Sequence, residues 1–263
     1  MSNVISVLSG KGGVGKSIIS LNLATALASL NSRVLLIDFN LTSPSLNLML
    51  GEINPEFHLN HYLKGLSLEK DIVYAHPSGL KLIFNSGEEV PNKDLVSRLD
   101  SLIDSLSNYF DYIFIDTSPS LSEDTQKAIF CSQFAIGVSE PTISSLTHTF
   151  RVLKFAEEKN TDIVGIILNK VGLLNTEISI KAIENITNYK VLGEIAFNNK
   201  IQKSELIKHP LVYLYRNHKL SQNFFKIAQF LMGSKYEEML DKHAKKSLDE
   251  VYSKLGLDPK KHE

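Results

Sequence analysis

Residues 9–17 read SGKGGVGKS. From Gly10 to Ser17 they follow the pattern G-x-x-x-x-G-K-[ST], in which glycines let the backbone turn tightly and aim its N–H groups inward. An apolar run, VISVL at residues 4–8, precedes the pattern, and an amphipathic segment at residues 17–30 follows it. A strand, a loop of this kind and a helix together form a cradle for phosphate groups, with the positive end of the helix dipole aimed at them.

The last two residues of the pattern have defined tasks. We expect Lys16 to reach the β- and γ-phosphates of a nucleotide, and the Ser17 hydroxyl to bind Mg²⁺. The alternative is a glycine-rich turn without a ligand, and it is disfavoured because both the motif and its strand–helix context are present. The expected nucleotide contacts are Gly10, Lys11, Gly12, Gly13, Val14, Gly15, Lys16, Ser17 and Ile18.

The composition indicates one large globular domain. The chain has 263 residues, a net charge of −1 and 43% hydrophobic residues, which is enough for a well-buried core. The near-neutral balance argues against a nucleic-acid surface spread over the whole protein. We see no signal peptide and no apolar run long enough to cross a membrane, so a cytoplasmic setting is expected. Cys131 is the single cysteine and is expected to be a small buried side chain.

Short apolar runs alternate with amphipathic, helix-like segments along the chain. The runs are nearly continuous in Val, Ile, Leu and Phe, as in strands that are covered on both faces. This alternation predicts an α/β fold, with a mostly parallel twisted sheet, helices on both faces, and ligands beyond the carboxyl ends of the strands. The expected strands are residues 4–8, 33–39, 80–84, 112–116, 134–138, 162–169 and 191–197.

The pattern changes at Gly233 and Ser234. We therefore divide the chain into a P-loop domain at residues 1–233, expected to bind a nucleotide, and a C-terminal amphipathic helical tail at residues 234–263. The polar face of the tail mixes acidic and basic side chains, whereas helices that bind lipid favour Lys and Arg. Packing on the body or on a protein partner is thus favoured over contact with a membrane surface.

Lys11 is a second lysine in a loop that ordinarily needs one. With it, residues 11–17 resemble the "deviant" Walker A loop, KGGxGK[ST], of the MinD/ParA family of ATPases, and the chain looks closest to the MinD-like members. The resemblance implies that Lys11 reaches across a homodimer interface to the nucleotide of the other subunit. A cation supplied in this way stabilises the charge on the γ-phosphate while it joins two protomers.

Further motifs carry the resemblance over about the first 230 residues. DFNLTSPSLNLMLG at residues 38–51 is similar to the family's switch I segment, and FDYIFIDTSPSL at residues 110–121 is similar to its Walker B strand and switch II turn. The resemblance implies ATP or ADP as ligand, Mg²⁺ held by Ser17, Asp38 and Asp116, and an adenine contact from Asn169. An amide suits the adenine edge because it donates and accepts together.

The chain departs from the family pattern at Asn40. The family has D-x-D in switch I, with the second aspartate positioning the attacking water, but this chain has Asp38, Phe39 and Asn40. An asparagine can orient water but cannot accept its proton. The resemblance implies Lys11, Lys16, Asp38 and position 40 as the catalytic groups, and Asn40 predicts slow or conditional hydrolysis. The alternative is a scaffold that binds ATP without hydrolysing it.

Three other functions fit less well. A ParA-like, DNA-associated ATPase needs a basic surface, and the basic residues between positions 200 and 226 form no dense cluster. An iron–sulfur carrier of the related Mrp class needs paired thiolates, which a single cysteine does not provide. A small-molecule kinase would leave Lys11 without a task. The sequence therefore predicts an ATP-dependent dimerising switch that binds a further, unidentified protein, with a peripheral membrane location as an alternative.

Overall fold

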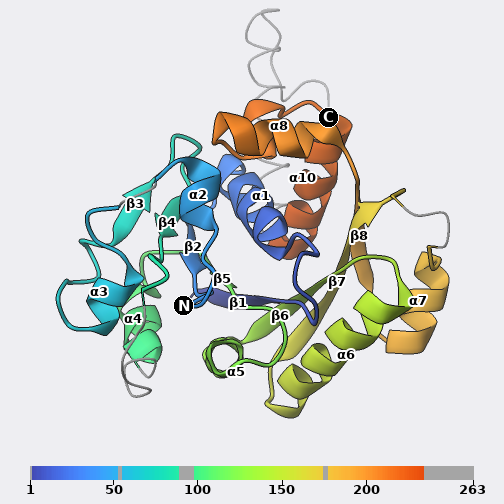
Figure 1. Ribbon diagram of the computed structural model, residues 1–263, viewed down its shortest axis with the longest axis horizontal. Coiled ribbons are helices and arrows are strands. Elements are labelled where there is room, and N and C mark those ends of the chain that lie inside the picture. The colour runs from blue at the N-terminus through green and yellow to red at the C-terminus, as the bar shows by residue number, and fades with distance from the viewer. Residues whose placement is uncertain (1, 53–54, 89–97, 174–176, 234–263) are drawn as a thin grey trace, which may run out of the picture.

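The computed structural model describes residues 2–52, 55–88, 98–173 and 177–233 (Figure 1). An eight-stranded sheet in the order β3-β4-β2-β5-β1-β6-β7-β8 forms its centre. Neighbouring strands run parallel except β3 and β4, so the expected α/β fold with a mostly parallel sheet is confirmed. The strands are β1 (Asn3–Leu8), β2 (Val34–Asp38), β3 (Val73–Ala75), β4 (Lys81–Ile83), β5 (Tyr112–Asp116), β6 (Phe134–Ser139), β7 (Asp162–Val171) and β8 (Val191–Ala196).

The central strands β2 and β5 are apolar up to their last residue because both faces of the sheet are covered there. In β2, Val34 and Leu36 belong to the core on one face, while Leu35 and Ile37 belong to the core on the other. Side chains alternate between faces along a strand, so a strand buried on both faces needs apolar residues at every position. This is why the seven longer runs could be recognised in the sequence. β3 has only three residues, pairs antiparallel at the edge of the sheet, and was not expected.

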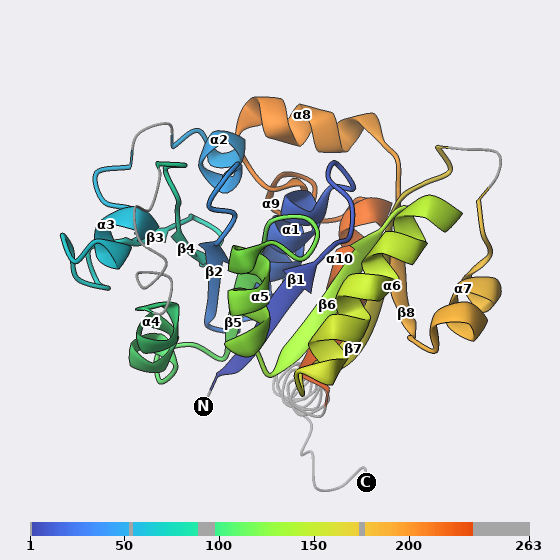
Figure 2. The same cartoon turned by 60° about the horizontal axis from the view of Figure 1, so that its bottom comes forward.

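Helices cover the two faces in separate groups (Figures 1 and 2). The helices α1, α9 and α10 pack on one face, and α4, α5, α6 and α7 lie on the other. Helix α8 contacts both α2 and α9. The helices are α1 (Lys16–Ser29), α2 (Leu46–Leu50), α3 (Leu59–Leu63), α4 (Arg98–Leu106), α5 (Glu123–Phe130), α6 (Ile143–Glu158), α7 (Ile180–Thr187), α8 (Asn199–Ile207), α9 (Leu211–Leu214) and α10 (Lys219–Met232).

The register of the central strands brings the polar motifs to one edge of the sheet. Asp38 and Asp116 are the last residues of β2 and β5 and are direct partners in the register. Val7 of β1 is paired with Asp116 from the other side, so the loop that begins two residues later passes over the same edge. The carboxyl ends of three adjacent strands thus meet at one point, as parallel sheets require of a ligand site.

Two expectations concern parts of the chain outside this edge. The helical tail at residues 234–263 lies outside the described residues, so the division at residue 233 stays a prediction. Cys131 was expected to be buried but is half-buried, because it follows the last turn of α5, and its Sγ donates to Asp100 Oδ1 at 2.5 Å. Within the described ranges, no helix combines the length and the apolar character that crossing a membrane requires.

Candidate nucleotide-binding site

The loop between β1 and α1 borders a cavity of about 520 Å³. Two of its glycines need positive φ angles, 78° at Gly13 and 86° at Gly15, which is the left-handed region that other residues rarely adopt. Gly15 is also the N-cap of α1, so the backbone enters the helix directly from this turn. Eight of the nine expected phosphate-loop residues line the cavity: Lys11, Gly12, Gly13, Val14, Gly15, Lys16, Ser17 and Ile18.

Gly10 is the ninth residue, and it does not line the cavity. Its N–H donates to Thr149 Oγ1 at 3.2 Å, on helix α6. A Cβ on Gly10 would lie 2.0 Å from the carbonyl carbon of His148, so only a glycine allows the loop to approach this helix so closely. Gly10 therefore fixes the loop against α6.

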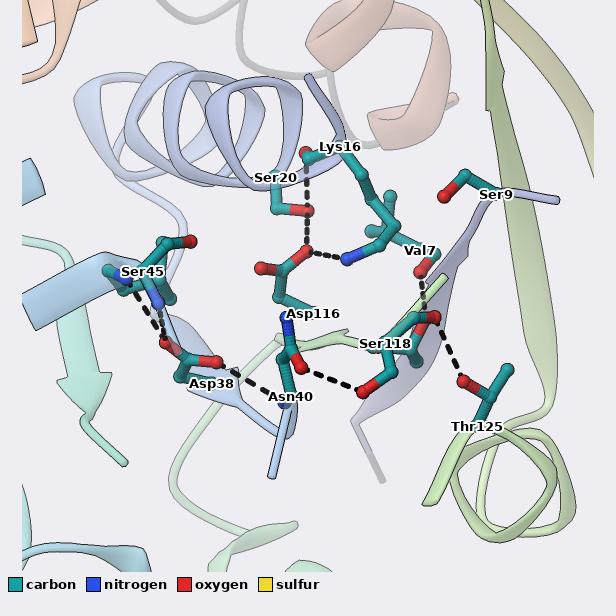
Figure 3. A network of polar contacts seen from close by, with 12 residues as sticks. Val7, Ser9, Lys16, Ser20, Asp38, Asn40, Ser45, Asp116, Ser118 and Thr125 are labelled. Atoms are coloured by element: carbon teal, nitrogen blue, oxygen red, sulfur yellow. Dashed lines mark hydrogen bonds and ion pairs between the residues drawn. The ribbon is translucent and has the colours of Figure 1, made fainter. Parts of the chain in front are cut away.

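Lys16 and Asp116 form a buried ion pair at the base of the loop (Figure 3). Lys16 Nζ lies 2.8 Å from Asp116 Oδ1, and the two side chains are 6% and 0% exposed. The hydroxyl of Ser20, one turn further along α1, donates to the same oxygen at 2.9 Å. The other oxygen, Asp116 Oδ2, is buried without a hydrogen-bond partner among the described residues. An orphaned carboxylate oxygen in such a place is a candidate metal ligand.

Asp38 is fully buried and faces three backbone donors. The N–H groups of Ser45 and Leu46 donate to its Oδ2 at 3.0 Å each, and the N–H of Asn40 donates to its Oδ1 at 3.2 Å. Burial, followed by the charge of Asp116, raises the pKa of Asp38 to about 7, although the three N–H groups act in the opposite direction. Asp38 thus shapes the segment that follows β2, and a cation bound beside it would favour its charged form.

The residues fit a magnesium ion that arrives with phosphate groups. Asp116 faces Lys16, Asp38 is its register partner on the next strand, and Ser17 lines the adjoining cavity. Mg²⁺ is typically bound by one or two carboxylates plus substrate phosphates and water. In the described part of the chain, no group of three or more His, Cys, Asp or Glu residues forms a metal site made by protein alone. When bound, the ion would neutralise charge on the phosphates.

Asn40 lines the cavity, and its side chain is engaged on both sides. Its Nδ2 donates to the carbonyl of Ser43 at 2.7 Å, and its Oδ1 accepts from the N–H of Ser43 at 3.1 Å. The hydroxyl of Thr42 also donates to Oδ1, at 3.2 Å, and the hydroxyl oxygen of Ser118 lies within hydrogen-bond distance of it, at 2.8 Å. The amide therefore closes a turn after β2 and links it to the segment after β5 (Figure 3).

Asn169 lies under the loop, where it contacts protein. Its Nδ2 donates to the carbonyl of Val14 at 2.8 Å, and its Oδ1 is buried without a partner among the described residues. The adenine contact of Asn169 therefore stays a prediction. Lys170, which the sequence analysis did not single out, donates to the carbonyl of Gly13 at 2.6 Å and pairs with Glu140 at 2.7 Å. The end of β7 thus supports the phosphate loop through two successive side chains.

Lys11 is exposed, lines the cavity, and forms no ion pair with any residue of the described ranges. Other cavity residues were not predicted. Glu205 comes from α8, and burial raises the pKa of its carboxyl group. Glu205 belongs to no motif and could not have been found in the sequence. The other lining residues that were not predicted individually lie within the two switch segments or just before the loop: Ser9, Thr42, Ser43, Ser45, Met49 and Pro119.

Comparison with known families agrees with this geometry. Residues 5–211 match the model of the CobQ/CobB/MinD/ParA nucleotide binding domain. The chain belongs to this family. The match covers the phosphate loop, both switch segments and the support from β7, so the resemblance inferred from the motifs is confirmed.

Relatives and solved structures place the chain among MinD-like ATP-binding proteins. An uncharacterized ATP-binding protein of Methanocaldococcus jannaschii is 31% identical over 244 residues, which is 92% of each chain. The septum site-determining protein MinD from Pyrococcus horikoshii, solved with Mg-ADP, has a TM-score of 0.81 and 28% identity, over 89% of this chain and 97% of that one. MinD in the MinC:MinD complex of Aquifex aeolicus has a TM-score of 0.78 and 25% identity, over 88% and 96%.

Proposed function

We propose that this family member binds Mg·ATP, dimerises with it, and hydrolyses it slowly, so that the nucleotide controls binding of a protein partner. The exposed Lys11 carries the proposal. The loop already contains a buried lysine, Lys16, that can reach the phosphates from the same subunit. Lys11 lines the same cavity, stays exposed, and has no ion-pair partner in the described ranges. A cation in this position is available to the nucleotide of a second copy.

The nucleotide chemistry follows from charges that the structure brings together. Lys16 is expected to exchange Asp116 for the β- and γ-phosphates, which frees the carboxylate for Mg²⁺. The backbone N–H groups of the loop and the start of α1 then face the phosphates. Dimerisation adds Lys11 of the other copy to the γ-phosphate. Because only ATP has that phosphate, ATP and ADP differ in how strongly they favour the dimer.

The test is the mass of the protein in solution with each nucleotide. We expect monomers with Mg·ADP and dimers with Mg·ATP or a hydrolysis-resistant analogue, measured by light scattering after gel filtration. Lys11→Ala should remain monomeric with ATP while it still binds the nucleotide, since Lys16 is unchanged. Lys226→Ala, which removes an exposed lysine on α10, is the matched control and should dimerise as the wild type does. A wild type that stays monomeric with every nucleotide refutes the dimerisation.

The hydrolysis rate is a separate part of the proposal. Asn40 supplies an amide where the family pattern has a carboxylate, and that amide is already bonded to Ser43. We therefore expect turnover well below the median for enzymes, about 10 s⁻¹. Release of phosphate under saturating Mg·ATP measures it. Turnover near or above that median would contradict the interpretation of Asn40.

A scaffold that holds ATP without hydrolysing it is the second candidate, and the engaged amide of Asn40 favours it. The two candidates share the site and differ in turnover. Nucleotide extracted from the purified protein separates them, because a scaffold should retain intact ATP over hours while a slow ATPase accumulates ADP. The Aquifex structure shows MinC bound to MinD, and by analogy we propose that the ATP form of this protein binds a protein partner in the cytoplasm. A membrane-surface role would involve residues 234–263 and is not favoured.

A further inference from the structure

Position 40 lacks the carboxylate of the family pattern, but the carboxylate of Asp124 lies two hydrogen bonds away from Asn40. Asn40 Oδ1 lies 2.8 Å from the hydroxyl of Ser118, in the switch II turn. The same hydroxyl donates to Asp124 Oδ2. Asp124 lies in the first turn of α5, and nothing in the sequence motifs pointed to it. The neutral amide in switch I is therefore connected, through one hydroxyl group, to a negative charge on the helix that follows switch II.

Asp124 is buried, and its hydrogen-bond partners among the described residues are all donors. It is 7% exposed. Its Oδ1 accepts from the N–H of Thr125 at 2.9 Å and from the hydroxyl of Ser122. Its Oδ2 accepts from Ser118 and, at 3.4 Å, from the N–H of Leu41. A carboxylate without its proton can only accept, so this setting suits the charged form. Through Leu41 and Ser118, Asp124 holds both switch segments at once.

The hydroxyl of Ser118 has one proton and two acceptors. A hydrogen bond to a carboxylate is about twice as strong as one to a neutral group, so the Ser118 hydroxyl donates preferentially to Asp124. Asn40 tolerates this arrangement because its oxygen is neutral and has other donors in Ser43 and Thr42. An aspartate at position 40 would set two carboxylates on one hydroxyl. It would also place a carboxylate oxygen 2.7 Å from the carbonyl of Ser43, where Nδ2 now donates.

We propose that Asp124 is the positioning residue of switch I in this protein, and that it replaces the carboxylate that the family pattern has at position 40. It acts on switch I through the N–H of Leu41 and through Ser118, whose hydroxyl oxygen lies against Asn40 Oδ1 (Figure 3). Asn40 in turn lines the cavity. The inference rests on the proposed ATP hydrolysis and adds to it the residue that sets the rate. Asn40 and Asp124 are thus a matched pair: the neutral amide in one switch is compatible with the buried charge beside the other.

The first test compares Asp124→Asn with wild type in the full chain. We expect kcat for ATP to fall about tenfold or more, while the Kd for Mg·ATP changes less than about threefold, because Asp124 does not line the cavity. Glu158→Gln makes the same carboxylate-to-amide change on the exposed surface of α6 and should match wild type in both. Ser118→Ala removes the connecting hydroxyl and should lower kcat similarly. The double variant should be no slower than either single variant, because the two residues act as one unit.

The second test moves the carboxylate from position 124 to position 40. Asn40→Asp alone should lower kcat or leave it unchanged, since it crowds two carboxylates around Ser118. Asn40→Asp in the Asp124→Asn background should restore at least part of the lost kcat, because one carboxylate is again present on that hydroxyl. A residue that merely stabilises the fold would not be rescued by a charge at position 40. Asn40→Asp should therefore not raise kcat in the wild type but should raise it in the Asp124→Asn background, and this difference is the result that most directly supports the inference.

The outcomes separate this inference from the proposed function. A wild type that binds no Mg·ATP refutes the proposed function itself. A wild type that binds Mg·ATP without turnover, or turnover in which Asp124→Asn equals Glu158→Gln, overturns the role of Asp124 and leaves nucleotide binding intact. Asn40→Asp that speeds the wild type while failing to rescue Asp124→Asn also overturns it. Thermal melting of each variant verifies that the compared proteins are folded.

Discussion

Replacing Gly10 with alanine is expected to separate the phosphate loop from helix α6. The added Cβ would lie 2.0 Å from the carbonyl carbon of His148, 2.2 Å from its oxygen and 2.3 Å from the nitrogen of Thr149. Ordinary contact begins near 3.4 Å, so the loop and the helix must move apart by about 1.4 Å. All three obstructing atoms belong to the backbone and cannot turn aside as the end of a side chain can.

The expected cost follows from these contacts. Overfilling a packed interior typically costs about 1–3 kcal/mol, and a rigid backbone obstacle places this site at or above the upper end. The movement also breaks the hydrogen bond from the N–H of Gly10 to Thr149 Oγ1, a further loss of about 1 kcal/mol. Gly10→Ala should therefore lower the free energy of unfolding by about 4 kcal/mol. With a urea m-value of about 3 kcal/mol/M, the midpoint should fall by about 1 M or more.

Gly12→Ala is the control in the same loop. A Cβ on Gly12 would meet only the side chain of Pro119, at 3.9 Å, and its φ angle is not in the left-handed region. We expect its urea midpoint to match wild type within error. If Gly10→Ala instead unfolds within about 1 kcal/mol of wild type, the loop is not wedged against α6 as described, and the reasoning from the close approach is wrong.

Three further predictions concern charge. Burial, with a smaller effect from His209, lowers the pKa of His76 from 6.5 to about 4, so the folded protein favours the neutral imidazole. The stability that this group contributes is present above pH 6.5 and is lost as the pH falls towards 4. His76→Gln should reduce that loss by about 2 kcal/mol, measured by urea titrations at several pH values. The pKa of Asp38 is raised from 3.8 to about 7, so its protonated form contributes stability below pH 4 that is lost as the pH rises towards 7. Because Mg·ATP needs the charged carboxylate, it should bind more tightly at pH 8 than at pH 6 and release a proton on binding. Calorimetry in buffers of different ionisation enthalpy measures that release, and its absence would contradict the prediction. Lys170→Ala should weaken ATP binding about tenfold in a fluorescent-nucleotide titration, because it removes the hydrogen bond to the carbonyl of Gly13; unchanged affinity would show that the support from β7 is dispensable.

The parts of the site that could be predicted are those determined by neighbouring residues. The phosphate loop is one continuous motif, and its lysine, hydroxyl and glycines fall into place once a strand precedes it and a helix follows it. Asp38 and Asp116 could be assigned to the site from the family resemblance of their motifs, and the structure makes them direct partners because each ends its strand. The chain does not have to be folded for either argument to be made.

The rest depends on contacts between distant segments. Asp124 belongs to no motif, and it reaches Ser118 and Leu41 only because α5 begins beside both switch segments. Glu205 enters the cavity wall from α8, far along the chain. Position 40 illustrates the limit: the sequence shows the missing carboxylate, but the charge that can compensate for it is visible only in three dimensions.

The ion pair between Lys16 and Asp116 has a consequence for the order in which ligands arrive. A divalent cation alone would meet a carboxylate that already faces an ammonium group, and a nucleotide alone would have to draw that ammonium group away and leave the carboxylate exposed to phosphate. If the two arrived as one complex, Lys16 would face the phosphates and Asp116 would hold the metal, so neither charge would be left without a partner. Metal and nucleotide should therefore be mutually dependent ligands, each binding poorly in the absence of the other.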